Sequence, residues 1–488
     1  MSSSAHFTES GSFQRQSDEF ATWLASRPGV RVNSKILIAD LRGNAAGRGV
    51  VAQADILEGE ELFTIPRGLV LSTHNSKLKD LLPQDVEELG PWLSLILVMI
   101  YECLLGDQSA WAPYFKVLPQ NFDTLMFWSP SELQELQGSA IVDKIGKQSA
   151  EESILETIAP IIRSNPSLFP PIGGLPSYDG DVGAQALLHL SHIMGSLIMA
   201  YAFDIEKPDD GDDERVGEDG YLTDEEDEQS SKGMVPLADM LNADGDRNNA
   251  RLFQEEDSLA MKAIKPIKAG EEIFNDYGEI PRADLLRRYG YVTDNYAPYD
   301  VIELSLSQLC NAAGLQNASI ESQPSLQLLE SLELLDDGYA IPRPSSKDSL
   351  TDILPDELLL LLKTLALPVE ELARLQQKQK PPKPSFGQPE ARILSRAIQL
   401  NQSQYGTTLL QDQELLAQLK QLEATSGPAE GSTRRLKMAI QVRLGEKEIL
   451  QDLSAKLDAY LANSAPAAHK RTASGDDHDS RRTKAQRT

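Results

Sequence analysis

Short apolar runs alternate with glycine and polar positions between residues 34 and 71. The clearest are Lys35–Ile38, Gly49–Ala52 and Glu61–Ile65, the last of them directly before Pro66. Runs of this length, bounded by turn-forming residues, are typical of β-strands. Because no helical pattern separates them, we expect a meander of short strands and not a βαβ unit.

A block with helical periodicity interrupts these strands, from about residue 90 to residue 203. Its apolar positions recur at helical spacing in Trp92–Tyr101, Ser131–Leu136 and Ala184–Phe203. Strand-like runs then resume at Met234–Asn242, Ala250–Phe253, Leu259–Ala263 and Glu272–Phe274. The pattern therefore predicts an α+β fold in which a helical insert splits a domain of short strands.

Two segments of this β-region echo each other. Ile56-Leu-Glu-Gly-Glu-Glu-Leu62 and Ile267-Lys-Ala-Gly-Glu-Glu-Ile273 carry the same pattern around a glycine turn. We expect two similar strand-turn-strand elements within one sheet, and not a repeat array.

An acidic segment, Asp204–Lys232, separates the insert from the later strands. It has few apolar residues and cannot bury a core, so it is predicted to be a disordered loop. Its position leaves two interpretations open: long-range attraction of a basic partner, or a solvated insertion without a specific role.

The chain after residue 300 is predicted to form a second, all-α domain over 300–462. The helical segments are Leu326–Leu335, Pro355–Leu367, Val369–Gln377, Arg392–Gln404, Asp412–Leu422 and Ser432–Leu461. Residues 1–20 and 463–488 are predicted to be disordered. Two basic clusters in the tail, Lys470-Arg471 and Arg481-Arg482-Thr-Lys484, resemble a bipartite nuclear import signal, and a solvated tail is the alternative.

Composition narrows the classes of function. The formal charge of -28 argues against a general nucleic-acid binder and permits a basic protein as partner. Two cysteines, Cys103 and Cys310, cannot form a disulfide framework or a structural zinc site, so we expect a reducing compartment and no metal. The polar N-terminus is unlike a signal peptide and the apolar run at 92–105 is too short to span a bilayer, so we expect a soluble protein with no membrane partner.

Four motifs carry candidate chemistry when they are considered together. They are Ala46–Ala52, Pro236–Asn242, Glu272–Gly278 and Leu285–Tyr291. The first contains Gly47-Arg48-Gly49, which alone is a weak signal, because no Rossmann helix follows it and a plain β-turn has the same residues. In this order and spacing the four motifs resemble the SET-domain protein-lysine methyltransferases.

The insert and the helical C-terminal region sharpen the resemblance. A split SET region over 21–295 with an all-α domain after it resembles the branch that includes the Rubisco large-subunit methyltransferase. Trp111–Pro119 and Phe122–Gln137 in the insert agree with this branch, and the wording of the motifs is most similar to the ribosomal-protein lysine methyltransferases. The absence of cysteine clusters beside the motifs argues against the zinc-bearing histone methyltransferases.

The resemblance implies a function and partners. A substrate lysine would attack the methyl group of S-adenosyl-L-methionine in line, so alignment would be the main task of the site. The implied substrate is a basic protein, a ribosomal protein of the large subunit, and we expect a monomer in the nucleus and also in the cytoplasm. Methylation of a histone or another nuclear protein, or a catalytically silent SET-fold binding module, are the alternatives.

The resemblance also assigns roles to residues around the transferred methyl group. Tyr277 corresponds to the catalytic tyrosine, whose hydroxyl orients the amine and the methyl group; the alternative is a core tyrosine that caps a backbone group. Asn242 would contact the methionine part of the cofactor, or else be a turn residue. Ala243 stands where the family usually has histidine, so only its backbone contact to adenine would be kept.

The remaining candidates lie at the ends of the cofactor and at the lysine entrance. Gly47, Arg48 and Gly49 would approach the cofactor through their backbone. Tyr289 would pack at its adenine end, and Tyr201 would close over it from the last helix of the insert; a core aromatic is the alternative for Tyr289. Substrate contacts are implied for Ala202, Asp204 and Phe274, and a β-core phenylalanine is the favoured alternative for Phe274.

Overall fold

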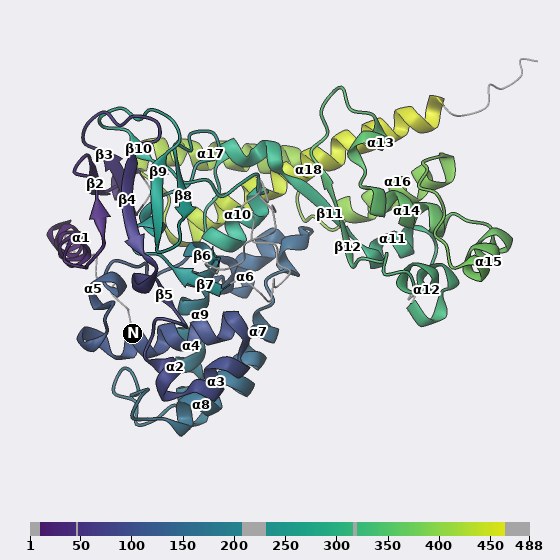
Figure 1. The fold of residues 1–488 in the computed structure, drawn as a ribbon. Coiled ribbons are helices and arrows are strands. Elements are labelled where there is room, and N and C mark those ends of the chain that lie inside the picture. The colour runs from purple at the N-terminus through teal and green to yellow at the C-terminus, as the bar shows by residue number, and fades with distance from the viewer. Residues whose placement is uncertain (1–9, 45–46, 207–230, 316–319, 464–488) are drawn as a thin grey trace, which may run out of the picture.

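The structure is a computed structural model that describes residues 10–44, 47–206, 231–315 and 320–463. An N-terminal domain of short strands and helices is joined to a C-terminal domain of helices, and one long helix, α18, runs across both (Figure 1). The strands of the N-terminal domain are β1 (Arg31–Val32), β2 (Ile36–Asp40), β3 (Arg48–Ala52), β4 (Glu61–Pro66), β5 (Leu71–Ser72), β6 (Ala202–Ile205), β7 (Ser231–Met234), β8 (Ala250–Gln254), β9 (Ser258–Ala263) and β10 (Glu272–Ile273).

Three small antiparallel sheets combine strands from both sides of the insert. Their strand orders are β1-β4-β9-β8, β10-β3-β2 and β5-β7-β6. The expected short strands are therefore present, although the segment predicted as Met234–Asn242 leaves the sheet after Met234 and forms a 3-10 turn at Ala238–Met240. Leu237 before this turn has a φ of 77°, a conformation that a strand residue does not adopt.

The two echoing segments pair with each other. The amide of Ile56 donates to the carbonyl of Ile267 at 2.9 Å, and the amide of Ile267 donates back at 3.0 Å. The expectation that both lie in one sheet is wrong, because β4 and β10 belong to different sheets. The bridge between Ile56 and Ile267 joins the two sheets instead.

Helices pack below and beside the sheets (Figure 1). The helices of the N-terminal domain are α1 (Ser10–Ala25), α2 (Leu78–Leu81), α3 (Pro83–Glu88), α4 (Gly90–Leu104), α5 (Ala112–Phe115), α6 (Pro130–Leu133), α7 (Lys147–Ser153), α8 (Ala159–Ser164), α9 (Gly180–Tyr201) and α10 (Arg282–Tyr289). The helical insert thus begins near Leu78, earlier than the predicted residue 90. Among the described residues, α9 is the one helix long and apolar enough to cross a membrane, with a mean hydropathy of 1.3, but half of it is buried in the core of the insert.

The predicted disorder of residues 1–20 is wrong for the part that the structure describes, since α1 begins at Ser10. Phe20, Trp23 and Leu24 share one helical face and are buried, and the Phe20 ring lies 6.0 Å from the ring of Tyr114. These three side chains fix the helix to the insert. Residues 1–9 lie outside the described residues. For the acidic segment, Asp204–Ile205 and Ser231–Lys232 form the ends of β6 and β7, and residues 207–230 lie outside the described residues.

The C-terminal domain is helical, with one pair of antiparallel strands that was not expected. It contains β11 (Val301–Ser305), α11 (Leu306–Ala312), α12 (Pro324–Glu330), β12 (Gly338–Pro342), α13 (Leu350–Ile353), α14 (Asp356–Leu365), α15 (Val369–Lys378), α16 (Gln388–Gln402), α17 (Leu409–Ser426) and α18 (Gly431–Asn463). In this antiparallel pair of β11 and β12, Ile302 pairs with Ile341 and Leu304 with Tyr339, and all four side chains are buried. The all-α prediction is corrected by this pair of strands. The basic tail at 464–488 lies outside the described residues.

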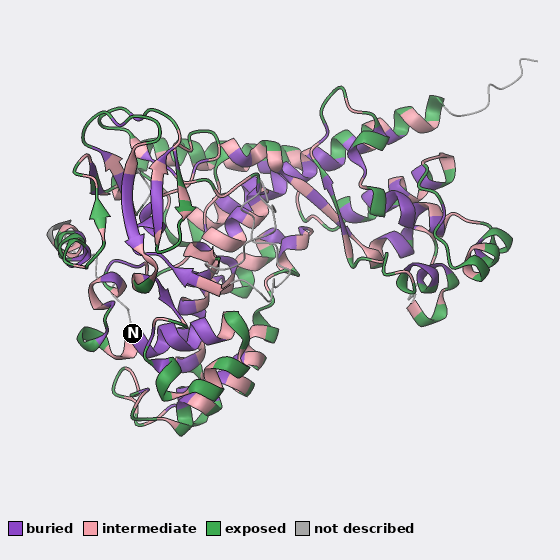
Figure 2. Cartoon of the chain, viewed as in Figure 1, coloured by how far each residue is buried: buried purple, intermediate pink, exposed green. Residues whose placement is uncertain are grey.

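Helix α18 belongs to the cores of both domains. Towards its C-terminus, Ile449, Leu450 and Leu453 are buried in the core of the C-terminal domain. Nearer its start, Met438 and Val442 pack in a separate cluster with side chains from the insert and from α10. Figure 2 shows the middle of α18 buried and its C-terminal end largely exposed. The two domains are therefore connected by a continuous packed helix and not only by a linker.

A buried carboxyl on α18 makes stability depend on pH. Glu446 accepts hydrogen bonds from Ser139 of the insert and from Tyr405 Oη at 2.9 Å, and burial raises its pKa from 4.5 to about 7. Between these two values the folded chain keeps a proton that the unfolded chain loses, so the free energy of unfolding falls as the pH rises through this window.

We expect Glu446→Gln, which resembles the protonated form, to raise the free energy of unfolding at pH 8 by about 1–3 kcal/mol and to change it little at pH 5. Denaturant unfolding at both pH values measures this. Asp452→Asn is the control, because Asp452 lies on the same helix and is exposed. An equal effect of Glu446→Gln at the two pH values would contradict the assignment.

Candidate active site

Asn242 and Gly49 come together at the edge of the β10-β3-β2 sheet. The amide of Asn242 donates to the carbonyl of Arg48 at 3.3 Å and to Glu272 Oε1 at 2.7 Å. A Cβ on Gly49 would strike Leu41, and would lie 2.8 Å from that carboxylate oxygen and 3.0 Å from the Asn242 amide nitrogen. Glycine is therefore required at position 49 for close packing, and the polar groups of this corner stay accessible to one another.

Since the sequence resemblance implies a cofactor site at this corner, we expect Gly49→Ala to displace Asn242 and to raise the dissociation constant for S-adenosylhomocysteine by ~10-fold or more, because the added methyl group occupies the space beside the amide. Calorimetric titration with S-adenosylhomocysteine measures this. Gly68→Ala is the matched control, since nothing lies within 4 Å of a Cβ at Gly68. Equal affinities for the two variants would show that the corner does not hold the cofactor.

The other two residues of the Gly-x-Gly segment are placed differently. The guanidinium of Arg48 points to α1 and the insert: it donates to Ser17 Oγ at 3.0 Å and to the carbonyl of Val117 at 3.0 Å, and it lies over the ring of Phe13. Gly47 is exposed, with open space around it. Of Arg48, only the backbone therefore faces the Asn242 corner, which agrees with the backbone role expected for it.

Ala243 keeps its backbone geometry without a histidine side chain. It bridges to Asn275, whose amide donates to the carbonyl of Asn242 at 2.9 Å, while the amide of Asp244 donates to the carbonyl of Asn275 at 3.2 Å. These bonds thread the segment after Asn242 beside the segment that leads to Tyr277. The two hydrogen bonds are made by the backbone of the residues on either side of Ala243, so they do not depend on the side chain at position 243.

A cluster of tyrosines lies next to this crossing. The rings of Tyr277 and Tyr289 are stacked, with centroids 4.0 Å apart and planes 8° from parallel, and Tyr291 lies 6.4 Å from Tyr289. The end of α9 brings Tyr201 close enough to add to the electrostatic environment of Tyr277. Helix α10 separates Tyr277 and Tyr289 in sequence but folds their two rings face to face.

Burial keeps these phenols in their neutral form. It raises the pKa of Tyr277 well above the ordinary value, and it raises the pKa values of Tyr201 and Tyr289 to about 12. At neutral pH each phenol therefore carries its proton and can donate a hydrogen bond. The cluster offers hydroxyl groups and aromatic surface, without a permanent charge of its own.

Asp239 and Tyr114 are a buried pair that was not predicted from the sequence. The hydroxyl of Tyr114, on α5, donates to one oxygen of Asp239, and the other oxygen is buried without a hydrogen-bond partner. Burial raises the pKa of Asp239 to about 7 and that of Tyr114 well above its ordinary value. The signal in the sequence was an aspartate within the apolar run Val235–Leu241, which a core does not normally contain.

The three expected substrate residues occupy different surroundings. Ala202 and Asp204 lie on β6, directly after Tyr201, and Asp204 forms an ion pair of 3.0 Å with Lys232 of β7. Phe274 is buried, with the Arg247 guanidinium 4.6 Å from its ring centre. Ala202 and Asp204 thus lie beside the end of α9, whereas Phe274 is buried beside Arg247.

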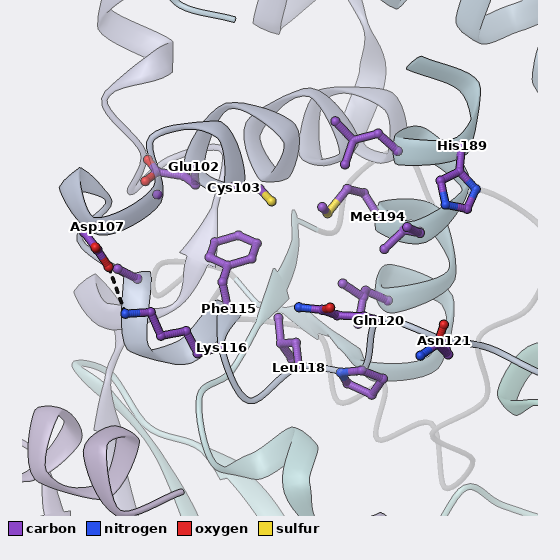
Figure 3. Close-up of a pocket in the computed structure, with 16 residues that line it drawn as sticks. Glu102, Cys103, Asp107, Phe115, Lys116, Leu118, Gln120, Asn121, His189 and Met194 are labelled. Carbon is purple, nitrogen blue, oxygen red and sulfur yellow. Dashed lines mark hydrogen bonds and ion pairs between the residues drawn. The ribbon is translucent and has the colours of Figure 1, made fainter. Parts of the chain in front are cut away.

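A cavity of about 550 Å³ lies in the insert, between α4, α5 and α9. Figure 3 shows Phe115 and Met194 facing it, with the Lys116–Asp107 ion pair of 2.8 Å at its rim. None of the site residues expected from the sequence lines it. It shares α9 with Tyr201 and α5 with Tyr114, since Phe115 follows Tyr114 in that helix.

The sequence of the chain matches two family models. A SET domain model matches residues 47–278, and a model described as Rubisco LSMT substrate-binding matches residues 319–450. Ribosomal lysine N-methyltransferase 4 of Saccharomyces cerevisiae is 38% identical over 309 residues, which are 62% of this chain and 60% of that protein. N-lysine methyltransferase setd6 of Salmo salar is 30% identical over 461 residues, covering 87% of this chain and 93% of the relative.

Solved structures agree on the fold. The structure of Rubisco LSMT bound to AdoMet has a TM-score of 0.64 at 22% identity, and covers 92% of this chain and 93% of that one. The structure of Rubisco LSMT bound to sinefungin and monomethyllysine has a TM-score of 0.66, also at 22% identity and with the same coverage. The chain belongs to the SET-domain family of protein-lysine N-methyltransferases.

Proposed function

We propose that this enzyme transfers a methyl group from S-adenosyl-L-methionine to a lysine of a large-subunit ribosomal protein. The observation that carries the catalytic part is the convergence of Gly49, Asn242 and the Tyr277–Tyr289 stack at one crossing of the chain. The ribosomal substrate is supported by the similarity to the yeast ribosomal lysine methyltransferase, which spans 60% of that relative's length.

The residues present fit S-adenosyl-L-methionine. The backbone at Gly47–Gly49, the Asn242 amide and the backbone of Ala243 would hold it, with Tyr201 and Tyr289 covering it. When bound, it supplies a methyl group on a sulfonium. The Gly49 corner, which a Cβ would fill, and the aromatic face of Tyr289 are the features of this chain that suit such a ligand.

Tyr277 would orient the reacting lysine. The lysine amine must be neutral to attack, and its ordinary pKa of about 10.4 means that its proton has to leave for solvent first. The neutral amine could then accept the methyl group that the bound cofactor would supply. A neutral Tyr277 hydroxyl would position this amine in line without adding a charge.

Methylation of another nuclear protein is the second candidate. The relatives named N-lysine methyltransferase SETD6 carry no ribosomal substrate in their name, and they align over most of their length, such as 89% for the protein of Rattus norvegicus. The basic clusters at Lys470-Arg471 and Arg481–Lys484 support a nuclear location of this enzyme, which suits either substrate.

A labelled-methyl assay distinguishes these substrates. The intact protein and radiolabelled S-adenosyl-L-methionine are divided among three reactions. One contains purified large ribosomal subunits, one contains small ribosomal subunits, and one contains nuclear extract without ribosomes. We expect label in one large-subunit protein, absent with Tyr277→Phe, and mass spectrometry then identifies the lysine. Label only in the nuclear extract would overturn the ribosomal substrate while leaving the methyltransferase activity in place.

A further inference from the structure

Helix α10 carries one half of the tyrosine stack, and both of its ends are tightly held. Its last residue is Tyr289, whose ring lies on Tyr277. After it, Gly290 has a φ of 75°, and a Cβ there would lie 2.9 Å from the backbone of Asp123 and Thr124. A small shift of α10 therefore displaces the ring of Tyr289 directly.

The first residue of α10 is bound by a carboxylate from the border of the C-terminal domain. The backbone amide of Arg282 donates to Asp300 Oδ1 at 3.1 Å, and its Nε donates to Asp300 Oδ2 at 2.9 Å. Both side chains are buried. Asp300 thereby satisfies the free amide at the start of the helix as well as the guanidinium, and it does so from the residue directly before β11.

A second arginine brings the C-terminal domain into the same cluster. Arg343, directly after β12, donates to Asp300 Oδ2 at 3.1 Å and to the carbonyl of Gly445 at 3.3 Å. It also pairs with Glu448 of α18 at 2.9 Å. One buried carboxylate is thus shared by an arginine of α10 and an arginine that directly follows β12.

Gly445 of α18 is the floor of this cluster. A Cβ at this position would strike the Asp300 carboxylate and would lie 2.5 Å from Arg282 Nη2. A glycine inside a helix is less stable than alanine, and Gly445 does not have a positive φ. Space for the ion cluster is therefore the reason that the structure gives for a glycine here.

Apolar packing repeats the connection on the next turn of each helix. Leu286 of α10 is fully buried against Met438, Ala439 and Val442 of α18. The same helix α18 is anchored farther along in the core of the C-terminal domain. The path from that core to Tyr289 contains only packed or hydrogen-bonded groups.

We propose that the cluster of Arg282, Asp300 and Arg343 on Gly445 positions the Tyr277–Tyr289 stack, so that the C-terminal domain sets the geometry of the cofactor site. Asp300, Arg343 and Gly445 are positioning residues, because they act through α10 and Tyr289. The part of this inference that concerns cofactor affinity rests on the proposed function.

Hydrogen exchange tests the positioning without any cofactor. In Gly445→Ala we expect the amides of α10 and of residues 275–292 to exchange ~10-fold faster, while the strands β4 and β9 keep their protection. Arg343→Lys keeps the positive charge but cannot make the same set of hydrogen bonds, so a smaller change in the same peptides is expected if Gly445→Ala does not fold. Gly406→Ala is the control, because its surroundings are open. Unchanged exchange in α10, or faster exchange spread over the whole chain, would overturn the proposal.

Binding of S-adenosylhomocysteine tests the consequence for the site. We expect Gly445→Ala and Tyr289→Leu each to raise the dissociation constant ~10-fold, and the double variant to be no weaker than the weaker single variant. Multiplication of the two effects would show that the cluster does not act through Tyr289. If the unaltered protein bound no S-adenosylhomocysteine, the proposed function would fail, while the exchange experiment would still decide the positioning.

Discussion

Replacing Tyr277 with phenylalanine should lower the rate of methyl transfer by about 100-fold or more, the usual effect of removing a hydrogen-bond donor from the reacting centre. The ring remains, so the stack on Tyr289, with centroids 4.0 Å apart, is kept. Affinity for S-adenosylhomocysteine should therefore change little while kcat falls. Single-turnover transfer and calorimetric titration measure the two quantities separately.

Tyr291→Phe is the matched control for this experiment. Tyr291 belongs to the same cluster and burial also raises its pKa well above the ordinary value, but its ring is 6.4 Å from Tyr289 and tilted, not stacked. We expect it to keep most of the activity. A loss of kcat as large as that of Tyr277→Phe would mean that the cluster as a whole, and not the Tyr277 hydroxyl, supports the transfer.

The largest loss of stability is expected for Asp412→Ala. This carboxylate is fully buried and accepts hydrogen bonds from Arg443 Nη2 at 2.8 Å and from Lys447 Nζ at 2.6 Å. Burial alone would raise its pKa, but the bonds from Arg443, Lys447 and Thr407 lower it below the ordinary value. Removing it leaves two buried cations of α18 without their shared partner, so the free energy of unfolding should fall by about 3–5 kcal/mol.

Denaturant unfolding measures this loss, and Asp107→Ala provides the comparison. Asp107 also pairs with a lysine, at 2.8 Å, but its side chain is 86% exposed, so we expect its removal to change the free energy of unfolding little. Similar losses for the two variants would show that the Asp412 pairs are no stronger than a surface ion pair. The difference between the variants isolates the effect of burial.

Local patterns in the sequence predicted most strands and helices, because periodicity and turn residues act over a few positions. Helix α1 escaped prediction because only Phe20, Trp23 and Leu24 mark its buried face in a polar segment. The pairing of β11 with β12 escaped it because α11 and α12 lie between the two strands in sequence and each strand is stabilised by the other.

The candidate site shows the same division. Motif order and family resemblance named Tyr277, Asn242 and Gly49, and the structure brings Gly49 and Asn242 together and stacks Tyr277 on Tyr289. The pair of Tyr114 and Asp239 joins residues far apart in the chain, so the apolar run around Asp239 marks the aspartate but not its partner. Tyr277 and Tyr289, to which the resemblance gives separate roles, are in face-to-face contact, and the position of α10 sets this contact.

The pairing of strands that lie on opposite sides of the insert has a consequence for synthesis of the chain. Strand β4 ends at Pro66, but its partner β9 begins only at Ser258, and β3 pairs with β10 at Glu272. On the ribosome the whole insert therefore emerges while β3 and β4 still have open edges, which are prone to pair with other chains. A nascent chain of this enzyme depends on its later strands, or on a chaperone, to cover those edges before the sheets can close.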